Sequence, residues 1–176
     1  MLLTLLLHNP QALGAIVRGT PSWVWAILAG LLVLGATQLR DRTAGVARAA
    51  AMPIVMTAFS AWGTWTAFGH ASIGVQVMAA WVLVALAVAA LVALGRARGS
   101  YDAVRREFRL PGSVVPLLLI AGIFLVKWCV GVEMALQPSR AGDAAFAFSV
   151  AVVYGLFSGL FAGRAARLWK LAAAQA

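Results

Sequence analysis

Five apolar segments, each close to the length of a membrane span, constrain the fold of this chain more than any other feature. Their bounds are about 21–39, 47–69, 74–95, 114–136 and 143–164. An α-helix needs about 20 apolar residues to cross a hydrocarbon core about 30 Å thick. None of the segments shows the alternation of apolar and polar residues that marks a transmembrane β-strand. The pattern therefore predicts an all-α fold, a polytopic bundle of five transmembrane helices.

Composition places most of the chain inside a bilayer. Of the 176 residues, 63% are hydrophobic and only 11% are charged, and the mean hydropathy is +0.93. A soluble domain is about one quarter charged, so this chain has too few polar side chains to cover a water-exposed surface. We predict an N-terminal interfacial segment at 1–19, the helical bundle at 20–170 and a C-terminal tail at 171–176.

The N-terminal segment is too short and too interrupted to span a membrane. Its apolar run at 2–7 is followed by polar residues and Pro10, which predicts an interfacial helix kinked at that proline. It carries no positive charge before Arg18, unlike a secretory signal. A natural start near Thr20 is the alternative. Thr20 is then expected to cap the first span and Pro21 to occupy its first helical position.

The positive charges set an orientation. Most Lys and Arg residues lie in the connections after the first and third spans or in the C-terminal tail. They are Arg40, Arg42, Arg48, Arg96, Arg98, Arg105, Arg106, Arg109, Arg164, Arg167 and Lys170. Only Arg18 and Arg140 flank the spans on the other side. The positive-inside rule therefore predicts the N-terminus outside and the C-terminus inside, and it accounts for the net charge of +9 without nucleic acid.

The connection between the third and fourth spans is the most basic part of the chain. Ser100 is a suitable N-cap for a short helix running to Leu110, which Pro111 and Gly112 would end. Its arginines are Arg96, Arg98, Arg105, Arg106 and Arg109. We expect this loop to lie on anionic lipid headgroups at the cytoplasmic surface. A docking surface for an acidic partner is the alternative.

A row of small residues in the fifth span predicts close helix packing. Gly155, Gly159 and Gly163 recur every fourth residue, and Ala151 extends the row upstream. This spacing puts small side chains on one stripe, where the backbones of two membrane helices can approach closely. The facing helix is expected to belong to the same chain, and a homo-oligomer or a larger complex is the alternative.

Two charges interrupt the fourth span. Lys127 lies near the bilayer midplane and Glu133 near the outer interface, on faces about 120° apart, so the two are not helical neighbours. A charge at membrane depth faces the protein interior, a wet cavity or a partner. Depth counting puts Tyr154 and Ser60 level with Lys127. These residues are candidates for a polar intramembrane cluster.

The second span adds hydroxyl groups to that cluster. Thr57, Ser60 and Thr64 share one helical face. Such hydroxyls often donate to a carbonyl in the preceding turn of their own helix. Lining a polar cavity is the other interpretation.

No residue pattern points to an enzyme, a metal or a cofactor. Cys129 is the only cysteine, which excludes an internal disulfide or a redox pair. His8 and His70 have no spacing typical of haem or metal ligands, and the sequence contains no catalytic motif. We therefore predict no enzymatic activity and no bound metal or cofactor.

Three segments taken together resemble a known family. They are TPSWVWAILAGLLVLGATQLRDR, SYDAVRREFRLPGSVVPLLL and AAFAFSVAVVYGLFSGLFAGRAARLW. The chain is similar over about residues 20–170 to a domain-of-unknown-function family of small proteobacterial inner-membrane proteins, with the first 19 residues as an extension. The resemblance implies a multi-pass location in a bacterial inner membrane. It implies no activity and no catalytic residues.

Two functions remain in competition. The first is a structural or accessory membrane protein that packs through its small-residue stripe. The second is a small oligomeric transporter or channel, in which Lys127, Glu133 and Tyr154 belong to a polar path. Five spans are few for a monomeric transporter, and no inverted repeat is visible, so the first is the main prediction.

Overall fold

The computed structural model describes residues 10–95 and 99–175, which fall into two compact units. The first unit comprises Met1–Leu39 and Ser113–Arg140, and the second comprises Arg40–Gly112 and Ala141–Ala176. The described residues are mostly helical, as predicted.

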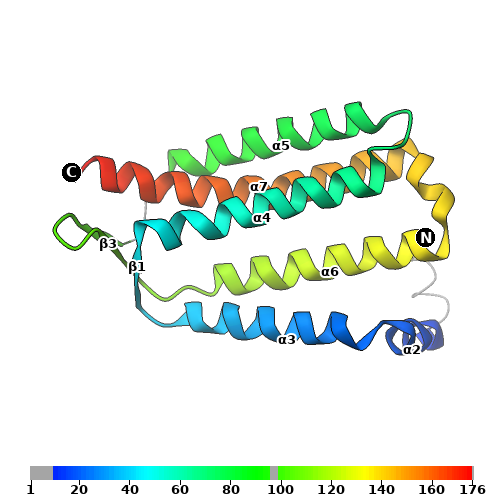
Figure 1. The fold of residues 1–176 in the computed structure, drawn as a ribbon, viewed down its shortest axis with the longest axis horizontal. Coiled ribbons are helices and arrows are strands. Elements are labelled where there is room, and N and C mark those ends of the chain that lie inside the picture. The colour runs from blue at the N-terminus through cyan, green and yellow to red at the C-terminus, as the bar shows by residue number, and fades with distance from the viewer. Residues whose placement is uncertain (1–9, 96–98, 176) are drawn as a thin grey trace. The chain divides into compact units, whose positions relative to one another are not determined.

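The first unit is built on two antiparallel helices. Its elements are α2 (Pro10–Gly19), α3 (Ser22–Ala36), the 3-10 turn η1 (Thr37–Leu39) and α6 (Val115–Leu136), after which η2 (Pro138–Gly142) leads on (Figure 1). Just before α3 begins, Thr20 Oγ1 accepts a hydrogen bond of 3.1 Å from Trp128 Nε1 of α6. At the other end of α3, Gly35 packs on Leu117, the third residue of α6. The two helices therefore run in opposite directions.

The second unit contains three long helices, α4 (Val46–Phe68), α5 (Gly74–Leu94) and α7 (Ala144–Ala173), which lie side by side in Figure 1. Phe68 at the end of α4 makes an edge contact with Phe146 at the start of α7, with ring centroids 6.2 Å apart, so these helices are antiparallel. In contrast, Gly155 meets Trp81 and Gly163 meets Val92, so α5 and α7 run parallel.

A three-stranded sheet stands where the sequence predicted a helix. The strands β1 (Arg42–Gly45), β2 (Ser100–Asp102) and β3 (Glu107–Leu110) pair antiparallel in the order β1-β3-β2. The expected helix from Ser100 to Leu110 is wrong, and this small sheet is an exception to the predicted all-α fold of a mostly helical chain. The Asp102 carboxylate accepts the backbone N–H groups of Val104 and Arg105 at 3.1 and 3.0 Å, which closes a turn instead of capping a helix.

The sheet has a buried face and an open face. Residues opposite one another in adjacent strands share a face, and the register puts Ala44, Phe108 and Tyr101 together. Phe108 is fully buried, and its ring centroid lies 5.0 Å from that of Tyr101. Burial of Phe108 against Tyr101 favours strands over the helix that the local sequence suggests.

Four helices are long and apolar enough to cross a membrane, by length and composition: Ser22–Leu39, Gly74–Leu94, Val115–Leu136 and Ala144–Ala173. The predicted span at 47–69 corresponds to α4, which is not among these four. It is 23 residues long, but it carries several threonine and tryptophan side chains and Ser60 in its second half, which make it less apolar.

The start of α3 differs from the prediction. Thr20 does not cap this helix, because its hydroxyl donates to the carbonyl of Ile16 at 2.8 Å and so belongs to the end of α2. Pro21 stands at the N-cap, and the helix begins at Ser22. The predicted interfacial segment contains α2, and the part of it before residue 10 lies outside the described residues.

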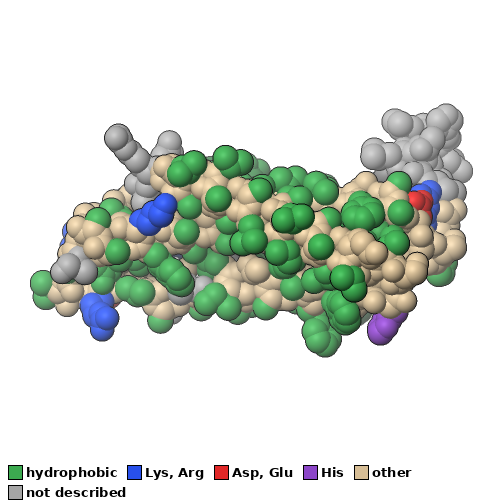
Figure 2. Space-filling view, turned by 90° about the horizontal axis from the view of Figure 1, so that it is seen from above, with side chains coloured by type: hydrophobic (Ala, Val, Ile, Leu, Met, Phe, Trp, Pro, Cys, Tyr) green, Lys and Arg blue, Asp and Glu red, His purple; other side chains and the backbone are tan. Residues whose placement is uncertain are grey.

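Large apolar side chains point outward along these helices (Figure 2). Leu83 of α5 is 67% exposed, and Val33 of α3 is 66% exposed. On the face shown in Figure 2, Lys and Arg atoms lie toward the helix ends and not along their middle. Exposed apolar surface of this extent is typical of a protein surrounded by lipid or by other protein.

Candidate functional site

The small-residue stripe of α7 faces α5. An added Cβ would lie 2.8 Å from the Trp81 carbonyl oxygen at Gly155, 2.6 Å from that of Ala85 at Gly159, and 2.8 Å from that of Ala89 at Gly163. Real Cβ atoms do not approach a backbone oxygen so closely. Only glycine therefore allows these two backbones their present separation.

The partner surface on α5 repeats at the same interval. Val84, Val88 and Val92 each lie against one glycine of the stripe. Ala151, the first residue of the stripe, is fully buried. In the second unit the stripe is therefore occupied by a helix of the same chain.

The hydroxyl groups of α4 make hydrogen bonds inside the second unit. Thr64 is fully buried and donates to the Ser60 carbonyl at 2.9 Å. The Ser60 hydroxyl accepts a hydrogen bond of 3.2 Å from Trp81 Nε1 of α5. Ser60 and Thr64 were predicted to belong to a polar cluster, but Trp81 was not. A tryptophan in an apolar helix gives no sequence signal for a polar contact.

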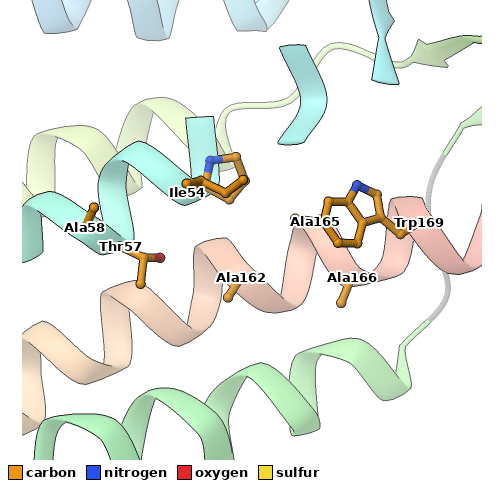
Figure 3. Close-up of a pocket in the computed structure, with 8 residues that line it drawn as sticks. Ile54, Thr57, Ala58, Ala162, Ala165, Ala166 and Trp169 are labelled. Carbon is orange, nitrogen blue, oxygen red and sulfur yellow. The ribbon is translucent and has the colours of Figure 1, made fainter. Parts of the chain in front are cut away.

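Thr57 lines an apolar pocket between α4 and α7 (Figure 3). The pocket has a volume of about 460 Å³. Its other lining residues are Pro53, Ile54, Ala58, Ala162, Ala165, Ala166 and Trp169. Only Thr57 and Trp169 bring polar side-chain atoms to it, so the pocket suits a hydrocarbon chain better than a polar solute.

Tyr154 lies in the core of the second unit. Its side chain belongs to the buried face of α7, and the residue is only 7% exposed. One turn later, the buried Ser158 donates its hydroxyl to the Tyr154 carbonyl at 2.9 Å. Among the described residues, every buried side-chain nitrogen or oxygen has a hydrogen-bond partner.

Glu133 and Lys127 lie in the first unit. Glu133 is 8% exposed, and one of its oxygens lies 3.6 Å from a guanidinium nitrogen of Arg140, which also donates from Nε to Gln137 Oε1 at 3.1 Å. Lys127 is half-buried in the middle of α6. Arg140 is seven residues, or two helical turns, beyond Glu133. That spacing could have identified the Glu133–Arg140 pair. Arg140 was considered only as one of the loop charges that set the predicted orientation.

The basic loop is a β-hairpin with its arginines in different settings. Arg105 and Arg106 stand in the exposed turn, where Arg106 adopts a positive φ of 55°. Arg109 lies on the open face of the sheet, because its register partners are Thr43 and Ser100. Arg96 and Arg98 lie outside the described residues.

Basic side chains of α7 contact the end of α5, which was not predicted from the sequence. Arg167 donates from Nε to the Val92 carbonyl, and Lys170 donates from Nζ to the Ala93 carbonyl at 3.2 Å. Carbonyls in the last turn of a helix lack partners within it, and cations are favoured there. The parallel register of α5 and α7 makes this contact, and sequence spacing alone gives no signal for it.

Arg42 of β1 shares the face of the sheet that carries Ala44 and Phe108. Partial burial lowers the pKa of Arg42 from its usual value, and an arginine remains charged at neutral pH after any ordinary shift.

Within residues 10–95 and 99–175, no group of three His, Cys, Asp or Glu side chains could hold a metal ion. Comparison with curated proteins and with solved structures finds no match. Residues 1–176 match a family of unknown function, DUF6622, and the match includes the first 19 residues that the sequence analysis set apart as an extension. The chain therefore belongs to this family of unknown function.

Proposed function

We propose that the chain is a five-span protein of a bacterial inner membrane, with its N-terminus outside and its C-terminus in the cytoplasm. We propose further that its role is structural or accessory. The bacterial location is taken from the resemblance of its segments to small proteobacterial membrane proteins. The number of spans and the role are argued from the described contacts.

The pairing of β1 with β3 supports five spans, because it requires an even number of membrane crossings between these strands. The strands β1 and β3 belong to one sheet, so they lie on the same side of the membrane. The described part of the chain between them contains two long helices, α4 and α5. Because α5 is apolar enough to cross, α4 must cross back to return the chain to the sheet. An α4 that stayed on one side would put the paired strands on opposite sides.

The positions of α4 and α7 agree with this argument. The two helices are antiparallel. At one end Phe68 contacts Phe146. At the other end Ile54 and Trp169 line the same pocket. If α7 crosses the membrane, α4 crosses beside it. Contact with the other helices explains why an α4 that is less apolar than its neighbours is tolerated at membrane depth.

The sheet end is expected to be cytoplasmic. Gln175 near the C-terminus accepts a hydrogen bond of 3.2 Å from the Tyr101 backbone N–H of β2. The C-terminus and both basic connections therefore share one side, and positive charge favours the cytoplasm.

A reporter fusion tests this topology. A reporter at the C-terminus is expected to be active only in a cytoplasmic format, and one inserted at His70, between α4 and α5, only in a periplasmic format. These are all-or-none differences. The His70 fusion tests α4 in particular, because a four-span chain without α4 would leave His70 on the sheet side. Cytoplasmic activity at both sites would exclude the five-span arrangement.

The hydrogen bonds of the candidate polar residues are the main support for a structural role. In the second unit the hydroxyls of Thr64 and Ser158 donate to carbonyls of their own helices, and Trp81 donates to Ser60. The α4–α7 pocket is apolar. In the first unit Glu133 lies beside Arg140. These groups stabilise helices and helix contacts, whereas a polar path needs groups that remain available to a solute.

Solvent access at Lys127 separates this role from a transporter or channel. In a Cys129→Ala background, Lys127→Cys is expected to react with a membrane-impermeant maleimide at least about tenfold more slowly than Ser72→Cys in the exposed turn after His70, because thiolate formation needs water. Labelling of intact cells followed by a mass shift measures both rates. Equal rates would favour an aqueous path through α6 and contradict the structural role.

A further inference from the structure

The helix α7 has two faces of small residues, and they are occupied differently. On one face the glycine stripe is in close contact with α5. The other face carries Ala162, Ala166 and Trp169, at the i, i+4 and i+7 spacing of neighbours on a helix. There α4 stands opposite, and the pocket of about 460 Å³ remains between the two helices. This volume lies within the usual range for a small-ligand site.

The pocket is elongated along the two helices. On the α4 side, Pro53, Ile54, Thr57 and Ala58 line it from successive turns of one face. In Figure 3, Thr57 and Ala58 lie toward one end of the pocket and Trp169 lies at the other. An elongated pocket lined almost entirely by carbon suits a hydrocarbon chain.

The pocket is open at its rim. Three of its lining residues, Ile54, Ala58 and Trp169, are exposed. A ligand can therefore enter it from the side, without separating α4 from α7.

The depth of the pocket indicates what surrounds that opening. Phe68 of α4 and Phe146 of α7 mark one level near the ends of both helices, because their rings are in contact. At 1.5 Å per residue, Thr57 lies about 17 Å from that level along α4, and Trp169 lies about 35 Å from it along α7. A hydrocarbon core is about 30 Å thick, so the pocket occupies the half of the membrane next to the sheet. Acyl chains surround the opening at this depth, and Trp169 falls at the interface, where tryptophan is favoured.

The end of the pocket at Trp169 is basic. Arg167 and Lys170 lie on the same last turns of α7, and Lys170 is exposed. Basic residues at a membrane surface attract anionic lipid headgroups. An acyl chain that carries an anionic headgroup therefore complements both the apolar pocket and its basic end.

We propose that the pocket between α4 and α7 binds one acyl chain of an anionic phospholipid from the cytoplasmic leaflet. The proposal rests on the five-span topology proposed above, which puts α4 in the membrane and the sheet end in the cytoplasm. It differs from general attraction of a basic loop for headgroups, because it depends on side chains at membrane depth.

Binding of defined lipids to the purified full chain in neutral detergent tests the pocket. Native mass spectrometry measures the apparent affinity for the first phosphatidylglycerol bound. Ala166→Phe puts a ring into the pocket and should weaken the binding of long-chain phosphatidylglycerol about tenfold, because the ring displaces buried methylene groups of the lipid. Dihexanoyl phosphatidylglycerol has the same headgroup and short chains, and it should bind the wild type at least about tenfold more weakly than the long-chain form.

Ala90→Phe is the matched control. Ala90 is an exposed residue of α5 and follows Ala89, whose carbonyl oxygen faces Gly163 of α7. The same ring is therefore added at a similar depth but outside the pocket, and the affinity should stay within about twofold of the wild type. Ala58→Phe closes the pocket from the exposed side of α4. It should reproduce the effect of Ala166→Phe and serves if the α7 variant fails to fold.

Phosphatidylcholine with the same long chains separates the contribution of the chain from that of the headgroup. It should bind the wild type about fivefold more weakly than phosphatidylglycerol, the effect of about one basic residue near anionic lipid. Ala166→Phe should weaken its binding further, because both lipids place a chain in the pocket. Equal affinities for the two lipids would refute the anionic headgroup.

Three results would overturn binding in the pocket. Equal affinities of Ala166→Phe and Ala90→Phe for long-chain phosphatidylglycerol would show that the lipid binds elsewhere. Equal binding of the long-chain and short-chain forms would show that only the headgroup is recognised. A dimeric wild type that becomes monomeric in Ala166→Phe would identify a second copy of the chain as the occupant.

The reporter fusions keep this failure apart from that of the topology, because lipid binding in detergent does not depend on the side on which the termini lie. A cytoplasmic C-terminus with no effect of Ala166→Phe refutes only the lipid site. A periplasmic C-terminus with selective loss in Ala166→Phe would move the pocket to the other leaflet and refute the proposed cytoplasmic one.

Discussion

Gly159→Ala is expected to destabilise the protein strongly, although it adds a single methyl group. That methyl would lie 2.6 Å from both the Ala85 carbonyl oxygen and Val88 Cβ on α5. Backbone oxygen cannot rotate away, so the two helices must separate and the contacts beside Gly155 and Gly163 loosen with them. Overpacking of this kind costs about 1–3 kcal/mol, and here it opposes the gain in helix propensity from replacing glycine.

Gly30→Ala is the matched control for that substitution. Gly30 is also a glycine within a long apolar helix, but an added Cβ there has open space within 4 Å. It should leave the unfolding midpoint unchanged or raise it slightly. The midpoints are measured by titrating the detergent-solubilised protein with sodium dodecyl sulfate. Equal midpoints for the two variants would show that contact between α5 and α7 is not close at Gly159.

Phe108→Ala is expected to have the largest effect at the sheet end. Phe108 is fully buried and packs on Tyr101 in the only described sheet. Removing a buried phenylalanine ring costs about 3–5 kcal/mol, because the cavity left behind adds to the lost transfer free energy. Three short strands cannot stay paired without this side chain, so the hairpin should separate from β1.

Limited proteolysis of the purified protein measures this separation. Trypsin should cleave at Arg109 much faster in Phe108→Ala than in the wild type, because proteases need an unpaired backbone and Arg109 lies in the paired strand β3. Val104→Ala is the control, since Val104 lies in the same hairpin but is 95% exposed. Its cleavage rate should match that of the wild type. Rapid cleavage in both variants would mean that the hairpin is open regardless of Phe108.

The helices and the chemistry of their surfaces follow from local sequence patterns. A helix satisfies its backbone hydrogen bonds within one segment, and an apolar run of span length is a local property, so α3, α5 and α6 appear close to the predicted bounds. The helix α7 begins at Ala144, close to the predicted start of the fifth span, but continues to Ala173, beyond the predicted end at 164. The four-residue glycine spacing is local in the same sense. It predicts that one face of α7 accepts a close neighbour, whichever helix that is.

Which segments meet depends on contacts between distant parts of the chain. The sheet joins Arg42 to Leu110 across more than sixty residues of chain, and its pairing turned a predicted amphipathic helix into strands. The same is true of α5 as the partner of the glycines and of Trp81 beside Ser60. The free energy of each contact depends on two surfaces that are distant in sequence. The sequence of one segment describes only one of these two surfaces. It therefore cannot predict which other segment supplies the second surface.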